Sequence, residues 1–376
     1  MDALTTFVPM SAVDDQLGTI SSPEVRPFRE VSKGYTYFEQ GDVLFAKITP
    51  CMQNGKHAVA RDLIDGIGFG STEFHVLRPG AEVLAEWVHY YLRQPWVLSL
   101  AQAHLTGAVG QQRLPAAFLA DLQLPLPPLA EQRRIAARLT EAMAAVERAR
   151  AAAAKQLEAA RAIPSAYILQ VFDERHMAAW PMDKLAEVCE FLPARSIAVS
   201  GDTEVLAITT ACLTETGFNP DGAKRARMWA SDVAECTVRP GEILVARSNT
   251  AELVGRVAAF HGDPAGAVAS DLTIRLWPAA GVAGDFLAAS LTALYLRGYW
   301  RERAGGASGS MKKITRTQLA ELRVPLPPLA EQKRLAAALS ERLDAAARLA
   351  TDVRAQLDAT QALPAALLRQ AFSGEL

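Results

Sequence analysis

Polar side chains of the kinds that hydrogen-bond to nucleic-acid bases gather on short loops in both halves of the chain. Arg and Lys pair with guanine, Asn and Gln with adenine, and Ser and Thr with either. In the first half, the candidates are Lys47, Thr49, Gln53, Asn54, Lys56, His57, Gln111, Gln112 and Arg113. In the second half, the matching loops carry Arg247, Ser248, Asn249, Thr250, Ser310, Met311, Lys312 and Lys313. The residue types predict contacts to base edges, and solvated turns are the alternative.

A third basic cluster occurs in the second half only, at Lys224, Arg225 and Arg227. The other two loops recur in both halves at matching positions. Side chains placed alike in both halves suit phosphate binding or a structural role equally well, because residues that read different bases should differ. The loops therefore predict a DNA-binding surface without separating base contacts from phosphate contacts.

The chain carries none of the familiar motifs for phosphate-bond, methyl-transfer or hydrolytic chemistry. It contains no G-x-x-x-x-G-K-[ST] loop, no Asn/Asp-Pro-Pro-Tyr/Phe tetrapeptide and no H-E-x-x-H pair, and its six His residues are scattered. Its four cysteines, Cys51, Cys189, Cys212 and Cys236, are spaced too widely for a typical zinc site. We predict no catalytic residue, no metal and no cofactor, and therefore a protein that is not an enzyme.

Composition indicates an ordinary globular protein of two or three domains. The 376 residues are 50% hydrophobic and 21% charged, with a formal net charge of −2. A generic polyanion binder usually has a strong basic excess, so any DNA binding must rely on local patches. The first residues do not resemble a signal peptide, and no apolar run approaches the ~18 residues of a membrane span. We predict a cytoplasmic protein without membrane contact.

An internal repeat organises the whole sequence. The segment 124–132, LPLPPLAEQ, recurs 200 residues later as VPLPPLAEQ at 324–332. The same offset relates 41–47, GDVLFAK, to 241–247, GEILVAR. Anchors that agree while the surfaces between them diverge suit two copies of one fold that read different targets. A duplicated fold that has drifted without any reading role is the alternative.

Each copy has a mixed front and a helical back. Glycine-led apolar runs predict strands at 42–48 and 242–247, and further strands are expected at 73–77 and 273–277. Helices are expected at 85–92 and 286–296. The fronts are therefore α+β globules. We predict domains at 1–126 and 177–326, with helical spacers at 127–176 and 327–376.

The backs predict long helices from Leu129 and Leu329, with Pro164 and Pro364 marking their far ends. Apolar residues recur at nearly heptad spacing. The first seam is Ile135, Leu139, Ala142, Val146, Ala149, Ala153, Leu157 and Ala160, and the second is Leu335, Leu339, Leu343, Ala346, Leu349, Val353 and Leu357. Two such helices in one chain predict an antiparallel coiled-coil pair. Packing of each helix on its own globule, or on another protein, is the alternative.

The paired helix-opening element, L-P-P-L-x-E-Q after each α+β globule, resembles the specificity (S) subunit of type I restriction–modification systems. The segments 49–56, TPCMQNGK, and 71–74, STEF, are similar to its target recognition domains, and 180–189, WPMDKLAEVC, to the opening strand of such a domain. The resemblance covers nearly the whole chain.

This resemblance implies that each domain reads one half of a bipartite, asymmetric sequence in double-stranded DNA. It also implies that the helices set the spacer as a ruler, and that the subunit docks two modification (methyltransferase) subunits and recruits a restriction subunit without doing chemistry itself. The charged residues Arg133, Arg134, Lys333 and Arg334 could meet the methyltransferases or simply be solvated. A coiled-coil scaffold whose globules bind protein is the rival interpretation.

One departure affects the first copy. Residues 180–200 have no counterpart before the first globule. We expect either a start codon placed too far downstream or a first domain that has lost its opening strand.

Overall fold

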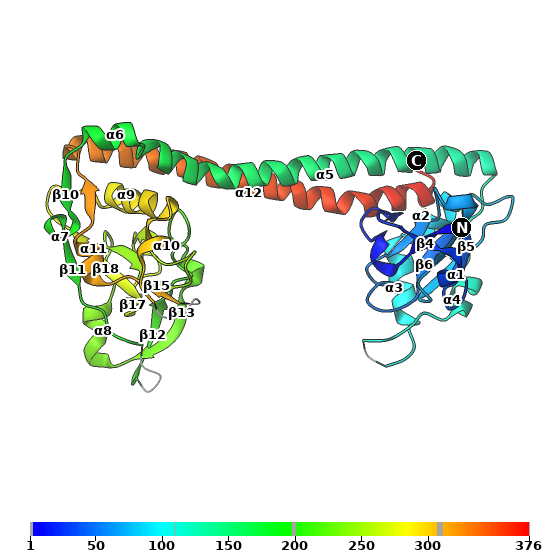
Figure 1. Ribbon diagram of the computed structural model, residues 1–376, viewed down its shortest axis with the longest axis horizontal. Helices are drawn as coiled ribbons and strands as arrows, with labels where there is room; N and C mark the ends of the chain where they lie inside the picture. Colours follow the sequence, from blue (N-terminus) through cyan, green and yellow to red (C-terminus); the bar gives the residue numbers. More distant parts are fainter. Residues whose placement is uncertain (1–2, 109, 198–200, 307–310, 376) are drawn as a thin grey trace. The chain divides into compact units, whose positions relative to one another are not determined.

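The computed structural model describes residues 3–108, 110–197, 201–306 and 311–375. The chain divides into two compact units, and each unit includes a portion of both long helices (Figure 1). Unit 1 comprises residues 1–155 and 353–376, and unit 2 comprises residues 156–352. No helix within the described ranges has the length and hydropathy required to cross a bilayer.

Unit 1 contains two main sheets and a small hairpin. Their strand orders are β4-β1-β8-β5, β7-β6-β9 and β2-β3. The strands are β1 (Leu4–Val8), β2 (Val13–Asp14), β3 (Thr19–Ile20), β4 (Glu24–Pro27), β5 (Thr36–Glu39), β6 (Val43–Ala46), β7 (His57–Val59), β8 (Ile67–Gly70) and β9 (Phe74–Leu77). The helices are α1 (Phe28–Val31), α2 (Ala85–Leu92), α3 (Pro95–Ala103) and α4 (Ala116–Asp121), with 3₁₀ turns η1 (Met10–Ala12) and η2 (Ile64–Gly66).

Unit 2 repeats this plan with additional pieces. Its sheets are β11-β18-β14-β16, β13-β12-β17, β10-β20 and β15-β19. The strands are β10 (Met182–Lys184), β11 (Cys189–Leu192), β12 (Thr203–Ile208), β13 (Lys224–Met228), β14 (Ile243–Ala246), β15 (Ser248–Asn249), β16 (Val257–Ala259), β17 (Val268–Ala269), β18 (Thr273–Pro278), β19 (Lys312–Lys313) and β20 (Arg323–Pro325). The helices are α6 (Glu174–Ala179), α7 (Leu185–Val188), α8 (Ala230–Cys236), α9 (Gly284–Leu296), α10 (Tyr299–Arg303) and α11 (Arg316–Ala320), with the 3₁₀ turn η3 (Pro220–Gly222).

The strand that opens each core follows a glycine turn. Gly41 and Gly241 have φ values of +89° and +95°, in the left-handed region that favours glycine. Their N–H groups bond to Ala60 O and Phe260 O, both at 2.8 Å. Strands β6 and β14 then bury every side chain, as continuous apolar runs should when both faces of a sheet are covered. The predicted strands and the α+β class are confirmed.

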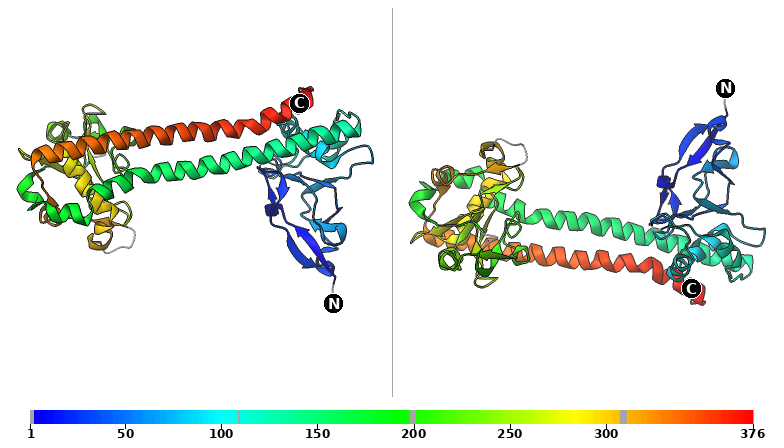
Figure 2. Two further views of the ribbon diagram at one scale, coloured as in Figure 1. Left: turned by 90° about the horizontal axis from the view of Figure 1, so that it is seen from above. Right: turned by 90° about the horizontal axis from the view of Figure 1, so that it is seen from below.

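The long helices are α5 (Leu129–Val171) and α12 (Leu329–Ser373), and they pair antiparallel (Figure 2). Within unit 1, Ile135 and Leu139 near the start of α5 share a buried cluster with Leu368 and Ala371 near the end of α12. Within unit 2, the roles are reversed, and Ile168 on α5 packs with Leu339 on α12. The helices thus pack on each other and also on the globules.

Two details of the helix prediction are wrong. Pro164 and Pro364 lie inside the helices, which continue for at least a further turn. A proline removes one hydrogen bond and crowds the preceding turn, but packing of the residues beyond it offsets that cost. Ile168 and Leu368 are 1% and 3% exposed.

The seam is also shifted by one residue in its middle. Ala149 and Leu349 are exposed, and the partly buried positions are 150 and 350 instead. Buried and partly buried positions then follow 139, 143, 146, 150, 153, 157 and 160, with the same pattern 200 residues later. This spacing is a strict heptad, whereas the sequence suggested a step of four at Ala149 because alanine is apolar.

A buried glutamine attaches each long helix to its globule. Gln132, which is 0% exposed, accepts from Leu84 N (2.9 Å) and donates to the carbonyls of Glu82 (2.9 Å) and Pro127 (2.8 Å). In unit 2, Gln332 accepts from Ala283 N (2.8 Å) and donates to the carbonyl of Pro327 (2.7 Å). The same side chain therefore joins the start of the helix, the preceding proline turn and the helix N-terminus of the globule.

The two units differ at one sheet edge. In unit 2, β11 pairs with β18, and β10 pairs with β20. In unit 1, β9 is an edge strand that pairs only with β6 among the described residues. Leu126 is correspondingly 50% exposed, whereas its counterpart Leu326 packs on the core of unit 2. In unit 2, β10 and β11 supply this cover.

We predict that Gln132→Leu destabilises unit 1 by about 2–4 kcal/mol. The leucine fits apolar surroundings but leaves one buried N–H and two carbonyls without partners, and each such group costs about 1–3 kcal/mol. Urea-dependent oxidation of buried methionines measures the effect unit by unit, because Met52 in unit 1 and Met228 in unit 2 are both 0% exposed.

Gln332→Leu is the matched variant and should shift Met228 instead of Met52. Glu131→Ala is the control, because Glu131 is exposed and pairs only with Arg134 one turn away. Equal shifts at both methionines for Gln132→Leu would contradict a local anchoring role.

Candidate nucleic-acid interface

The loop after β6 in unit 1 is folded as a tight turn around Met52. The N–H groups of Met52, Asn54 and Lys56 bond to carbonyls of residues 48, 50 and 51 at 2.9–3.0 Å. Met52 is buried in the core, and Gln53 and Asn54 on either side of the turn are exposed. The turn therefore presents two amide side chains to solvent, as predicted.

The second candidate loop is hydrogen-bonded to the first. Thr49 N donates to Gln112 O (2.9 Å), Gln112 N donates to Thr49 Oγ1 (3.1 Å), and Leu114 N donates to Lys47 O (2.8 Å). Loops that are 60 residues apart in the sequence thus form one continuous surface. Lys47, Gln53, Asn54, Gln111, Gln112 and Arg113 belong to it.

Two predicted base readers hold the surface together instead of presenting their side chains to solvent. Thr49 is 9% exposed, and its hydroxyl accepts the Gln112 bond. The Lys56 ammonium donates to the carbonyls of Val13 (2.6 Å) and Met10 (3.4 Å). Their polarity suited a base-reading role in the sequence, but Thr49 binds the backbone of the second loop and Lys56 binds backbone carbonyls at Met10 and Val13.

A third segment, just before β9 and within the 71–74 segment that resembles target recognition domains, completes the surface. Lys47 N donates to Glu73 O at 2.8 Å. The Glu73 carboxylate holds the Arg113 guanidinium through two bonds, Nε–Oε2 at 3.0 Å and Nη2–Oε1 at 2.7 Å. The Arg113 hydrogen bond lowers the pKa of Glu73 below its usual value. The sequence places Glu73 in that segment and at the start of a predicted strand, but it gives no sign that the carboxylate pairs with Arg113.

Unit 2 builds the equivalent surface with the same backbone bonds. Ile314 N donates to Arg247 O (2.9 Å), and Arg247 N donates to Leu272 O (2.9 Å). Ser248 and Asn249 form β15, which pairs antiparallel with Lys313 and Lys312 of β19. Ser248 is 6% exposed, and Lys313 is exposed. The predicted candidate Ser310 lies outside the described residues.

The third basic cluster belongs to a different sheet. Lys224, Arg225 and Arg227 lie on β13, which pairs with β12. Arg225 pairs with Glu204 (3.1 Å), and Arg227 Nε donates to Gly201 O (2.7 Å). Lys224 is exposed, and its side chain has no such ion pair or hydrogen bond among the described residues. It is therefore the member of the cluster best placed to meet a ligand.

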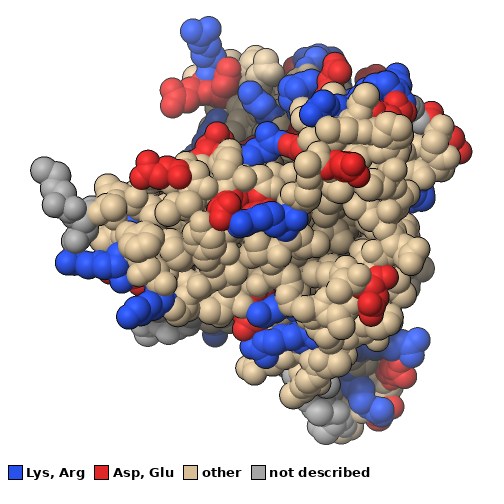
Figure 3. Space-filling view, turned by 90° about the vertical axis from the view of Figure 1, so that its right-hand side faces the viewer, with Lys and Arg blue, Asp and Glu red and all other residues tan. Residues whose placement is uncertain are grey.

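Charge on the molecular surface is mixed. Figure 3 shows Lys and Arg side chains interspersed with Asp and Glu on one face, with a wide expanse of uncharged side chains between them. This fits the net charge of −2 and means that any attraction to a polyanion comes from local features such as the loop surfaces.

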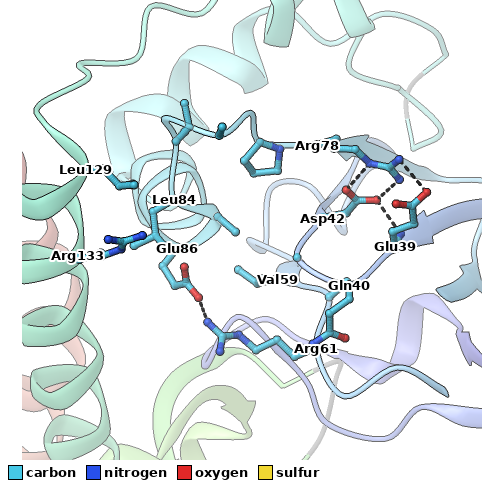
Figure 4. A pocket seen from close by; sticks show the side chains of 16 residues that line it. Glu39, Gln40, Asp42, Val59, Arg61, Arg78, Leu84, Glu86, Leu129 and Arg133 are labelled. Atoms are coloured by element: carbon cyan, nitrogen blue, oxygen red, sulfur yellow. Dashed lines mark hydrogen bonds and ion pairs between the residues drawn. The ribbon is translucent and has the colours of Figure 1, made fainter. Parts of the chain in front are cut away.

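Unit 1 also has a cleft of about 540 Å³ beside the start of α5 (Figure 4). Arg78 donates two bonds to the buried Asp42 at 2.8 and 2.9 Å, and Arg61 pairs with Glu86. The predicted base readers are not among its lining residues. Because the predicted base readers lie outside this cleft, we place the candidate interface at the converging loops.

Comparison with known proteins identifies the segment that carries the first of these surfaces. Residues 24–156 match the family model described as "Type I restriction modification DNA specificity domain". Over this range the chain is similar to that domain. Segments 47–57, 71–73 and 111–113 all lie inside the matched range.

Curated relatives support the same family. The chain is 37% identical over 139 residues to the type I restriction enzyme EcoEI specificity subunit and to the EcoAI specificity subunit, both from Escherichia coli. The match covers 37% of this chain, and it spans only 23% and 24% of those relatives. The resemblance to type I specificity subunits is confirmed.

Solved structures extend the fold comparison to the whole chain. The HsdS subunit from Thermoanaerobacter tengcongensis aligns with a TM-score of 0.67 at 21% identity, covering 100% of this chain and 92% of that one. A structure of a type I R-M system, solved to explain complex assembly, aligns with a TM-score of 0.76 at 22% identity, covering 100% and 93%. Both matches include unit 2, so its fold is shared as well.

One predicted polar residue of the specificity domain turns inward. His57 is 0% exposed, stacks on Phe45 (5.1 Å between ring centroids) and lies near His89 (5.7 Å). Burial, and secondarily the charge of Arg93, lowers the pKa of His57 well below its usual value, and the same causes lower the pKa of His89 to about 3. Val257 occupies the matching register position in unit 2.

We predict that unit 1 loses stability below about pH 6.5 and that unit 2 does not share this loss. Both histidines are neutral when folded and bind protons when unfolded, so the free energy of unfolding falls as the pH drops below the unfolded pKa of ~6.5. The slope is at most about 1.4 kcal/mol per pH unit for each histidine.

His57→Val, which copies unit 2, should remove one of these protons and recover about 2 kcal/mol of the loss between pH 6.5 and pH 5. Oxidation of Met52 in urea at several pH values measures this, with Met228 as the internal control. Identical pH profiles for the variant and the parent would show that His57 does not titrate on unfolding.

Proposed function

We propose that this chain is the DNA-recognition subunit of a type I restriction–modification complex. Each unit reads one half of a bipartite sequence in double-stranded DNA, with reading domains at 1–126 and 177–326 and helical spacers at 127–176 and 327–376. The observation that carries the proposal is the repeated loop surface. Three segments converge through the same backbone bonds in both units, yet they carry different side chains.

In this role the chain is not an enzyme and needs no cofactor or metal. It docks two modification (methyltransferase) subunits and a restriction subunit, and it acts in the cytoplasm, where the DNA is. The repeat supports two similar docking faces: Glu131–Arg134 and Glu331–Arg334 form matched ion pairs at 2.6 Å at the start of each long helix. Amide and basic side chains on the converging loops favour DNA over the rival protein-binding scaffold.

Deletion of the gene tests the proposal directly. We expect a bipartite methylated motif in the host genome to disappear when this chain is absent and to return when it is restored, as read by methylation-sensitive sequencing. A methylome that is unchanged by deletion would contradict the proposal and favour the protein-binding scaffold.

A second experiment tests the spacer role of α5 and α12. Inserting one heptad into each helix, within 129–161 and 329–361, keeps the buried seam in phase and adds about 10 Å. At about 3.4 Å per base pair, the methylated motif should gain a spacer of about three base pairs while both half-sites stay the same. Changed half-sites with an unchanged spacer would contradict the ruler.

A further inference from the structure

One backbone position is shared by the two loop surfaces but carries opposite chemistry. Glu73 in unit 1 and Leu272 in unit 2 each accept, through the carbonyl, the N–H of the residue that follows the core strand, Lys47 or Arg247. Each also donates its own N–H to a serine hydroxyl two residues earlier, at 3.2 Å from Glu73 to Ser71 and 3.3 Å from Leu272 to Ser270. The two side chains therefore leave equivalent backbone sites.

In unit 1 this position neutralises and immobilises a basic side chain. Glu73 holds Arg113 by two hydrogen bonds, and its own side chain is only 23% exposed. Arg113 retains a half-exposed guanidinium edge at a fixed orientation. A guanidinium held in this way suits the O6 and N7 acceptors of guanine.

In unit 2 the same position is apolar. Leu272 is 48% exposed, and Met311, which directly precedes β19, is 45% exposed. Lys313 stands where unit 1 has Arg113, since Ile314 and Leu114 make the matching bonds to Arg247 and Lys47. Leucine cannot hold this lysine by an ion pair, so unit 2 offers an exposed lysine and an exposed hydrocarbon surface.

The apolar group that the major groove of DNA presents is the C5-methyl of thymine. We propose that the shared position is a specificity determinant, and that Leu272 packs on the methyl group of a thymine in the half-site read by unit 2. This rests on the proposed function and adds the base contact to it. A leucine so placed has a reason to be exposed on the loop surface, because DNA covers it.

The experiment removes either the thymine methyl group or the leucine side chain that would contact it. The intact complex of this chain with its methyltransferase subunits is titrated with duplexes that carry the methylated motif, in which each thymine is replaced singly by deoxyuridine. One replacement should weaken binding about fourfold, since a buried methyl-sized group contributes ~0.8 kcal/mol. Leu272→Ala should cause a similar loss on the thymine duplex and should be indifferent to that one replacement.

Leu349→Ala is the matched control, because Leu349 is 45% exposed on α12 and should leave every affinity unchanged. The double variant Leu272→Glu with Lys313→Arg rebuilds the unit 1 pair and should also lose the response to the methyl group while still folding. The inference is overturned if specific binding persists but no thymine replacement weakens binding in a way that depends on residue 272. If the parent complex shows no specific binding, the proposed function itself fails.

Discussion

The amide of one buried glutamine in each repeat determines where the long helices begin and what they are attached to. Gln132 and Gln332 each bind a globular helix N-terminus and the carbonyl of a proline that precedes the long helix. A single planar group with one acceptor and two donors meets these demands, and no apolar residue could. The helices can act as rigid extensions of the globules because this joint is fully hydrogen-bonded.

The loop surfaces show how one scaffold carries two different sets of side chains. Their backbone bonds are the same in both units, so the positions from which side chains emerge are fixed by the fold. The side chains then differ: Glu73 and Arg113 form an ion pair in unit 1, whereas Leu272 and Lys313 occupy the same places in unit 2. Recognition can therefore diverge without altering the elements beneath it.

Much of the architecture could be predicted from the sequence, because it depends on local patterns. Glycine-led apolar runs identified the core strands, and the repeated helix opening identified α5 and α12. Details that depend on distant packing could not be predicted. The helix continues past Pro164 because Ile168 and Phe172 are buried by unit 2. The seam includes Arg150 in place of Ala149, which residue type alone would not suggest, because arginine is charged and alanine is apolar.

The candidate surface, too, could be predicted only in part from the sequence. The residue types on the two loops were visible in the sequence, and their joining was not, because it depends on bonds between residues 60 positions apart. By residue type, Thr49 and Lys56 were as suitable for contacts to bases as Gln53 and Asn54. Only the structure shows that the first two bind backbone groups of neighbouring segments. Glu73 and Leu272 share a position but no chemistry, so comparison of the two copies by residue type alone passes over them.

The end of α12 has a consequence for how the protein is made. Phe372 packs on Trp87 and Tyr91, at 4.3 and 5.4 Å between ring centroids, although it is separated from them by nearly the whole chain. A ribosome releases the N-terminal domain long before it releases this residue. The globule that contains Trp87 and Tyr91 must therefore wait, with part of its aromatic core uncovered, until the end of α12 has been synthesised.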